Sequence, residues 1–249
     1  MKPFYAWREH LGIELPGARA LFTTRRGGYS KGPYASLNLG RLTKDDPAAV
    51  ERNRALLQAQ IGVPMAQIRQ VHGTRVLRLT ELPRQTATTP PPRSDPPEAD
   101  GQATATPGLA MLVLVADCLP IALAGDGAVA MLHAGWRGLA AGIVQEGVRA
   151  LRELGAAGPL AAAIGPGAGP CCYDVGEEVH AAFARHDDGV HRGAKLDLKA
   201  VARAELHGAG VDTVHDVQLC TICSEPALLF SHRRDRGRTG RQAGLVWLI

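Results

Sequence analysis

The chain has 249 residues, enough for one large domain or two small ones that each bury a core. The composition is 45% hydrophobic and 21% charged, which is typical of globular proteins, and the 4% aromatic content argues against stacking platforms for single-stranded nucleic acid. A net charge of +4 suits an anionic small substrate but is weak evidence for any partner. Five cysteines, an odd number, argue against a disulfide framework and for a reducing cytoplasm.

Neither a secretory signal nor a membrane helix is expected. The N-terminus, MKPFYAWREHLG, carries early charges and lacks a long apolar core. The longest apolar run, residues 108–125, is interrupted by Asp117 and Pro120, so no run reaches the roughly 18 residues that a membrane helix needs. We therefore expect a cytoplasmic protein without a membrane partner.

The first half of the chain predicts a strand, a helix and a second strand. Residues 19–40 are typical of a strand followed by a loop rich in Gly, Ser and Pro. A helix is predicted over 47–61, because Pro47 suits a first turn and apolar residues recur every three or four positions. Residues 67–79 resemble a strand interrupted at His72 and Gly73.

A Pro-rich segment at 83–97 holds six of the 17 prolines, which excludes a central strand or a helix. We predict a surface loop there rather than a domain boundary, because the segments on both sides carry groups that we expect to converge.

The second half alternates strands and helices. Residues 109–123 are apolar enough for a strand buried on both faces, and a Gly-Asp-Gly turn at 125–127 leads into another strand. An amphipathic helix is predicted over 139–155, ending at Gly155. Further strands are expected at 160–166, 213–219 and 245–249, and further helices at 177–186 and 196–210. This pattern predicts an α/β domain with mixed sheets.

Three residues are candidate metal ligands. His72 and His133 each end a strand-like run, and Cys118 lies within an apolar run, with separations of 46 and 15 residues. A catalytic zinc takes three protein ligands of these types and keeps a fourth position open. Spacing leaves the ordinary alternatives standing, a small buried thiol for Cys118 and a hydrogen-bonded imidazole for each histidine.

The stretch MLHAGWRG places His133, Trp136 and Arg137 on one strand-to-helix turn. A packed core does not need these polar groups there, so the turn favours a site that holds a metal or an anion. The H-x-E signature of the zinc nucleobase deaminases is absent, since Gly135 stands two residues after His133.

The remaining cysteines and the glycine-rich stretch are ambiguous. Cys220 and Cys223 form a C-x-x-C pair, but only the adjacent Cys171 and Cys172 are free to join it, so we expect poor metal geometry and a structural role. The GPGAGP stretch fails the dinucleotide-binding pattern, because Pro170 occupies the third glycine position. A plain loop and a tight turn near a ligand both remain open.

Arginines complete the set of candidate groups. Arg25 and Arg26 precede a double glycine, and five more arginines lie within residues 233–241. Guanidinium groups bind phosphate through paired hydrogen bonds. A nucleic-acid patch is disfavoured because aromatics do not interleave with the arginines, whereas a solvated basic loop stays an alternative for the last cluster.

Taken together, the motifs resemble a known family. TTRRGGYS, QVHGTRV, ADG, VADCLPI, HAGWRG and LCTICSEPALLFSHRRDRGRTGR occur in this order. From about residue 20 to the C-terminus, the chain resembles the laccase-domain family of the YfiH and YlmD type, which an older name calls multicopper-oxidase-like. Its members are described as purine nucleoside phosphorylases and some as peptidoglycan editing factors.

The resemblance implies a fold, a cofactor and an activity. We expect one compact α/β domain over residues 1–249, layered α-β-β-α, with one zinc ion held at the active site by His72, Cys118 and His133. The implied reaction is phosphorolysis of adenosine, inosine, guanosine or methylthioadenosine to the base and ribose-1-phosphate, with adenosine deamination as a second activity. The partners would be a purine nucleoside and phosphate, and the protein a monomer or homodimer.

Substrate contacts are predicted from residue type and motif position. We expect Arg25, Arg137 and Arg233 to contact phosphate or substrate, and Ser30 and Asn38 to contact ribose or base. His232 stands where the family commonly has Tyr, which bears on substrate preference.

Three alternatives are weighed against this assignment. A hydrolase that edits a misincorporated muropeptide precursor stays open. A copper phenol oxidase is disfavoured, and copper is favoured less than zinc, because the nine histidines include no H-x-H pair. A non-catalytic binding module is disfavoured because all three ligands are present.

Overall fold

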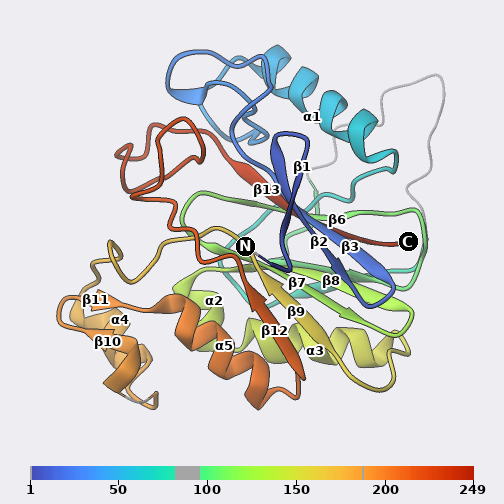
Figure 1. Cartoon of the computed structure of the whole chain (residues 1–249), viewed down its shortest axis with the longest axis vertical. Coiled ribbons are helices and arrows are strands. Elements are labelled where there is room, and N and C mark those ends of the chain that lie inside the picture. Colours follow the sequence, from blue (N-terminus) through green and yellow to red (C-terminus); the bar gives the residue numbers. More distant parts are fainter. Residues whose placement is uncertain (1, 82–95, 187) are drawn as a thin grey trace.

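Two β-sheets packed face to face form the centre of the molecule, and helices cover the outer face of each sheet (Figure 1). The computed structural model describes residues 2–81, 96–186 and 188–249. The layers run helix, sheet, sheet, helix, so the predicted single α/β domain with α-β-β-α layering is confirmed.

The first sheet has five strands, and each neighbouring pair is antiparallel. In sheet order the strands are β1 (Tyr5–Trp7), β2 (His10–Leu15), β3 (Ala18–Phe22), β13 (Gln242–Leu248) and β6 (Met111–Val115).

Helix α1 (Pro47–Ile61) covers the outer face of this sheet, with Leu57 in the same buried cluster as Leu21 and Leu245. The Asp46 carboxylate caps its first turn by accepting from the Ala48 amide, and Gly62 ends it in the left-handed conformation. The predicted helix and its bounds are confirmed.

The second sheet has six strands and is mixed, with antiparallel pairing in the middle and a parallel pair at each edge. In sheet order the strands are β12 (Thr213–Asp216), β9 (Ala161–Ile164), β7 (Leu119–Gly125), β8 (Ala128–Ala134), β5 (Gly101–Thr104) and β4 (Val76–Leu79).

Helices α2, α3 and α5 cover the outer face of the second sheet, and their apolar side chains share one cluster with Leu132 and Ile121. Their bounds are α2 (Trp136–Ala141), α3 (Ile143–Glu153) and α5 (Leu198–Gly208). The shorter elements are α4 (Glu177–Ala182), β10 (His191–Arg192), β11 (Lys195–Leu196) and two 3-10 turns at Gly32–Tyr34 and Asp188–Val190.

A dense apolar core lies between the two sheets. Phe22 and Val113 from the first sheet share a buried cluster with Met131 from the second. Alanines at Ala122 and Ala163 line the same cluster, and their small side chains let the sheets approach closely. Cys118, one of the candidate metal ligands, packs against this core.

The prediction of one strand over 109–123 is wrong. The run contains β6 and β7, which belong to different sheets, and the chain turns between them at Ala116–Cys118 with Asp117 at φ 88°. Both strands are apolar, so the apolar pattern continues on each side of the turn and is broken only at Asp117 and Pro120.

Two further predictions need correction in their bounds. Only Val76–Leu79 of the predicted strand 67–79 is a strand, because the part before it forms the loop that holds His72. The predicted helix over 139–155 is two helices, α2 and α3, separated at Gly142, whose φ is 97°. Strands β1, β2 and β5 are not predicted from the sequence.

The Pro-rich surface loop predicted at 83–97 falls largely on residues 82–95, which lie outside the described residues.

Among the described residues, every helix is too short or too polar to cross a membrane.

Candidate metal centre

Three donor side chains converge where both sheets end. His72 comes from the loop before β4, and Cys118 comes from the turn between β6 and β7. His133 is the second-last residue of β8. Their ligand atoms lie within 4.8 Å of one another, and His72 Nε2 is 3.9 Å from Cys118 Sγ. Two imidazoles and one thiolate form a three-ligand set of the kind that leaves a position open on a catalytic zinc.

Asp100 positions both histidines, His72 through its backbone and His133 through its ring. Its carboxylate accepts from the backbone amides of Val71, His72 and Gly73 at 3.1, 2.9 and 2.6 Å, which fixes the loop that carries His72. Asp100 Oδ1 also lies 2.8 Å from Nδ1 of His133. This contact leaves Nε2 of His133 available for a metal, the arrangement that supports histidine ligands in metalloproteins.

Asp117 positions the Cys118 turn from the other side. Its Oδ1 accepts from Thr221 Oγ1 at 2.6 Å, and its Oδ2 accepts from the Arg233 amide at 2.7 Å. The Asp117 carbonyl accepts from the Ala168 amide at 2.7 Å. Three segments that are distant in the sequence therefore hold the left-handed turn next to Cys118.

Gly135, two residues after His133, leaves room for the donors. A Cβ at this position would lie 3.1 Å from Cys118 Sγ and 3.1 Å from His72 Cδ2. Gly135 has φ −76°, an ordinary backbone conformation, so glycine is needed there for space alone.

The three donors also set each other's charge. Burial alone would raise the pKa of the Cys118 thiol, but the charge and hydrogen bond of His133, with a hydrogen bond from His72, lower this pKa to about 6. Burial alone would lower the pKa of His133, but Cys118 and Asp100 raise it to about 9. A thiolate is the form of cysteine that binds metals, so the surroundings favour ligation.

A pocket of about 610 Å³ opens beside the donors. All three donors line it, together with Tyr173, His232 and the apolar side chains of Ile68, Leu112 and Leu114. This volume lies within the range of small-molecule sites, and the mixture of apolar wall and charged groups is typical of them.

Five arginines and a single acidic residue, Asp117, line this pocket among the described residues; the arginines are Arg41, Arg54, Arg69, Arg233 and Arg241. Arg41 pairs with Glu51, and Arg69 pairs with Glu98.

Among the described residues, the guanidinium groups of Arg54 and Arg241 donate hydrogen bonds to backbone carbonyls alone. Arg54 is buried, donates to the Leu39 carbonyl at 2.8 Å, and its Nε has no partner within the described part of the chain. Burial, with repulsion from Arg41, lowers the pKa of Arg54 to about 10. Burial also lowers the pKa of Arg241, which donates to the Gly240 carbonyl at 2.9 Å. Neither cation forms an ion pair with a carboxylate within residues 2–81, 96–186 and 188–249, so the pocket is suited to an anion.

The residues that the sequence predicts as substrate contacts lie in different settings. Arg25 donates to the carbonyls of Pro33 and Pro226 at 3.2 and 2.9 Å, outside the pocket wall. Ser30 is buried and accepts from Asn53 Nδ2 at 2.9 Å. These bonds brace the loop after β3, and a contact of Arg25 or Ser30 with substrate stays a prediction.

Asn38 does not line the pocket but binds the backbone of two residues that do. Its Oδ1 accepts from the amides of Gly40 and Arg241 at 3.0 and 2.9 Å, which positions two residues of the pocket wall. Arg137 is exposed and its guanidinium lies 4.3 Å from the Trp136 ring centroid, outside the pocket lining. Arg233 does line the pocket, 4.7 Å from the Tyr173 ring centroid. Direct contacts to substrate by Asn38, Arg137 and Arg233 stay predictions.

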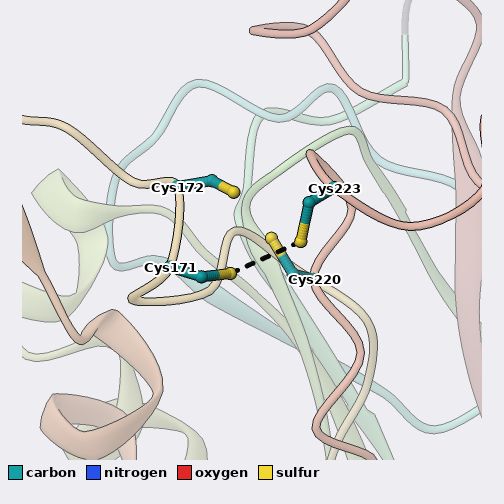
Figure 2. A group of neighbouring side chains, drawn as sticks. All are labelled: Cys171, Cys172, Cys220 and Cys223. Atoms are coloured by element: carbon teal, nitrogen blue, oxygen red, sulfur yellow. Dashed lines mark hydrogen bonds between the residues drawn. The ribbon is translucent and has the colours of Figure 1, made fainter.

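Sequence reasoning missed several groups of the site. Asp100 is visible only as part of the ADG motif, and Arg54 resembles an ordinary solvent-facing residue of a helix. The expectation of poor geometry for the remaining cysteines is wrong, because the Sγ atoms of Cys171, Cys172, Cys220 and Cys223 lie within 4.8 Å of one another (Figure 2).

Comparison with known proteins assigns the family. Residues 19–249 match the family described as multi-copper polyphenol oxidoreductase laccase. The chain belongs to this family, the laccase-domain proteins of the YfiH and YlmD type.

Relatives and solved structures agree along nearly the whole chain. A purine nucleoside phosphorylase of Xylella fastidiosa (strain Temecula1) is 43% identical, with 94% of this chain and 93% of the relative covered. The crystal structure of a YfiH protein from Bacillus licheniformis is similar with a TM-score of 0.89, 31% identity and full coverage of both chains. YlmD from Geobacillus stearothermophilus gives a TM-score of 0.88 and 36% identity, with 98% of each chain covered.

Replacing Gly135 with Ala tests the space beside the donors. The added methyl would press on both Cys118 and His72, so we expect zinc affinity to fall by about tenfold, equivalent to about 1.4 kcal/mol. Competition with a chromophoric chelator measures the affinity. Gly208→Ala is the matched control, because a Cβ there meets nothing within 4 Å. Equal affinities for Gly135→Ala and Gly208→Ala would contradict the steric argument.

Proposed function

We propose that the protein is a zinc-dependent purine nucleoside phosphorylase. The observation that carries the proposal is the pocket itself, where a group of metal donors shares one cavity with the buried Arg54 and the half-buried Arg241. Neither arginine forms an ion pair with a carboxylate among the described residues. Phosphorolysis needs a bound phosphate anion next to a nucleoside. The arginines of this pocket suit the phosphate, and its apolar side chains suit the nucleoside. Relatives of the family support the same activity, since the Xylella fastidiosa protein bears that name.

The donor set fits zinc. His72, Cys118 and His133 supply two nitrogen atoms and one sulfur, and Asp100 holds the backbone of His72 and the ring of His133. When bound, zinc would supply Lewis-acid polarisation of a substrate atom. Copper phenol oxidation, which the family's description suggests, is disfavoured because the chain lacks H-x-H pairs.

The arginines would hold phosphate. Arg54 offers an Nε–H that has no partner in the described part of the chain, and Arg241 and Arg233 offer guanidinium groups in the same cavity. A dianionic phosphate would neutralise the positive charges of these arginines, which repel one another in the pocket. Paired N–H donors would fix the orientation of the phosphate. An oriented phosphate is the nucleophile that attacks the anomeric carbon of the ribose.

The apolar wall would hold the nucleoside. Ile68, Leu112 and Leu114 offer a surface for the flat purine, next to the metal donors. As the glycosidic bond breaks, the ribose gains positive charge, which the adjacent phosphate anion stabilises. The chain's own contribution is therefore to bring the two reactants together and to exclude competing water.

The assay uses purified protein with adenosine, with and without inorganic phosphate, and chromatography of the products. We expect adenine and ribose-1-phosphate that appear only with phosphate, and no product from Cys118→Ala, which lacks the thiolate donor. Inosine formed without phosphate would assign deamination to the same site instead. Absence of both products from zinc-loaded protein would contradict the proposal and favour the muropeptide-editing alternative.

Replacing Arg54 with Met tests the anion site. Loss of a charged hydrogen bond removes about 1.5–3 kcal/mol, so the KM for phosphate is expected to rise roughly 10–100-fold. The KM for nucleoside should change much less. Arg52→Met is the control, because Arg52 lies on the same helix but is exposed and stacks 4.0 Å from the Tyr29 ring centroid. An unchanged phosphate KM in folded Arg54→Met protein would contradict phosphate binding by Arg54.

A further inference from the structure

Four cysteines outside the candidate active site gather into one compact group. Figure 2 shows the side chains of Cys171, Cys172, Cys220 and Cys223 around a common centre. The sulfur atoms of Cys171 and Cys223 are 3.4 Å apart, and all four lie within 4.8 Å of one another. None of the four is in a disulfide.

The topology explains why these residues meet. Cys171 and Cys172 belong to the loop after β9, and Cys220 and Cys223 belong to the loop after β12. β9 and β12 are parallel neighbours, so their C-terminal loops leave the sheet at the same edge. A bridge between Gly167 and Cys220 extends this pairing into the loops.

The loop backbone is shaped around the sulfur atoms. The Gly169 amide donates to Cys220 Sγ at 3.2 Å. A Cβ on Gly169 would lie 3.0 Å from Cys220 Cβ, so the close approach of the two loops requires a residue without a side chain. The glycine-rich GPGAGP stretch thus has a role in bringing the two cysteine pairs together.

The dimensions fit one tetrahedral ion. A zinc–sulfur distance of about 2.3 Å places tetrahedral sulfur ligands about 3.8 Å apart, which is comparable to the spacing of this group. An iron–sulfur cluster also uses four cysteines, but it places several iron and sulfide atoms among them and therefore needs a wider group. Four protein ligands without an open position are typical of a structural rather than a catalytic zinc.

We propose that Cys171, Cys172, Cys220 and Cys223 form a structural zinc site, distinct from the candidate active-site group of His72, Cys118 and His133. The ion would join the loops after β9 and β12 and so reinforce the bonds between them, which include the Thr221 amide to the Gly167 carbonyl and the Gly169 amide to Cys220 Sγ.

The site would also brace the pocket. Thr221, between the two cysteines of the C-x-x-C pair, donates to Asp117, which adjoins Cys118. Tyr173 follows Cys172 directly and lines the pocket. Zinc at the four cysteines would therefore stabilise the turn that carries Cys118 and one wall of the cavity, while providing none of the ligands of the other site.

Metal analysis of the full-length protein tests the proposal. Protein purified without chelator should hold about two zinc ions per chain, and Cys118→Ala should retain about one, because its four-cysteine group is intact. The double variant Cys171→Ser with Cys223→Ser should also retain about one. Because Cys118→Ala keeps the proposed site but lacks the active-site thiolate, this result is independent of whether the protein is a phosphorylase.

Cobalt replacement identifies the ligands even if the double cysteine variant fails to fold. Cys118→Ala loaded with cobalt should show intense sulfur-to-cobalt charge-transfer absorption from several thiolates. Folded Cys118→Ala without bound metal would overturn the proposal, as would disulfides among the four cysteines in freshly purified protein. Iron with acid-labile sulfide in place of zinc would overturn it too.

Discussion

The candidate active site depends on one buried carboxylate. Asp100 accepts three consecutive backbone N–H groups from residues 71–73 and contacts Nδ1 of His133 at 2.8 Å. Burial alone would raise the pKa of Asp100, but these hydrogen bonds hold it below its ordinary value. A single charged group thus fixes two of the three donors, one through its backbone and the other through its ring.

The layered fold brings the remaining groups to the same place. Cys118 lies where the chain passes from the first sheet to the second, and Asp117 ties that turn to the loops after β9 and β12. Arg54 comes from α1, on the outer face of the first sheet. The candidate metal ligands of the pocket therefore lie near the ends of strands, whereas part of its cationic wall comes from a helix that covers the first sheet. The sheets and the helix are both needed to form the pocket.

The sequence predicts those features that local chemistry specifies. Pro47 and the 3.6-residue pattern indicate α1, and the donor types of His72, Cys118 and His133, supported by their motifs, indicate a group that the structure brings together. Contacts between distant segments are not visible in this way. The four cysteines meet only because β9 and β12 are parallel neighbours, and Arg54 is distinguished from other helix arginines only by its burial.

The most direct test of the account is the zinc affinity of Asp100→Asn, measured by chelator competition. Asn keeps the size of the side chain but loses the charge, and its NH₂ group would face amide donors. The account predicts affinity weaker by about 10–100-fold, whereas Asp126→Asn, in the exposed turn between β7 and β8, should bind as the unmodified protein does. Unchanged affinity in folded Asp100→Asn would contradict the central role of this carboxylate.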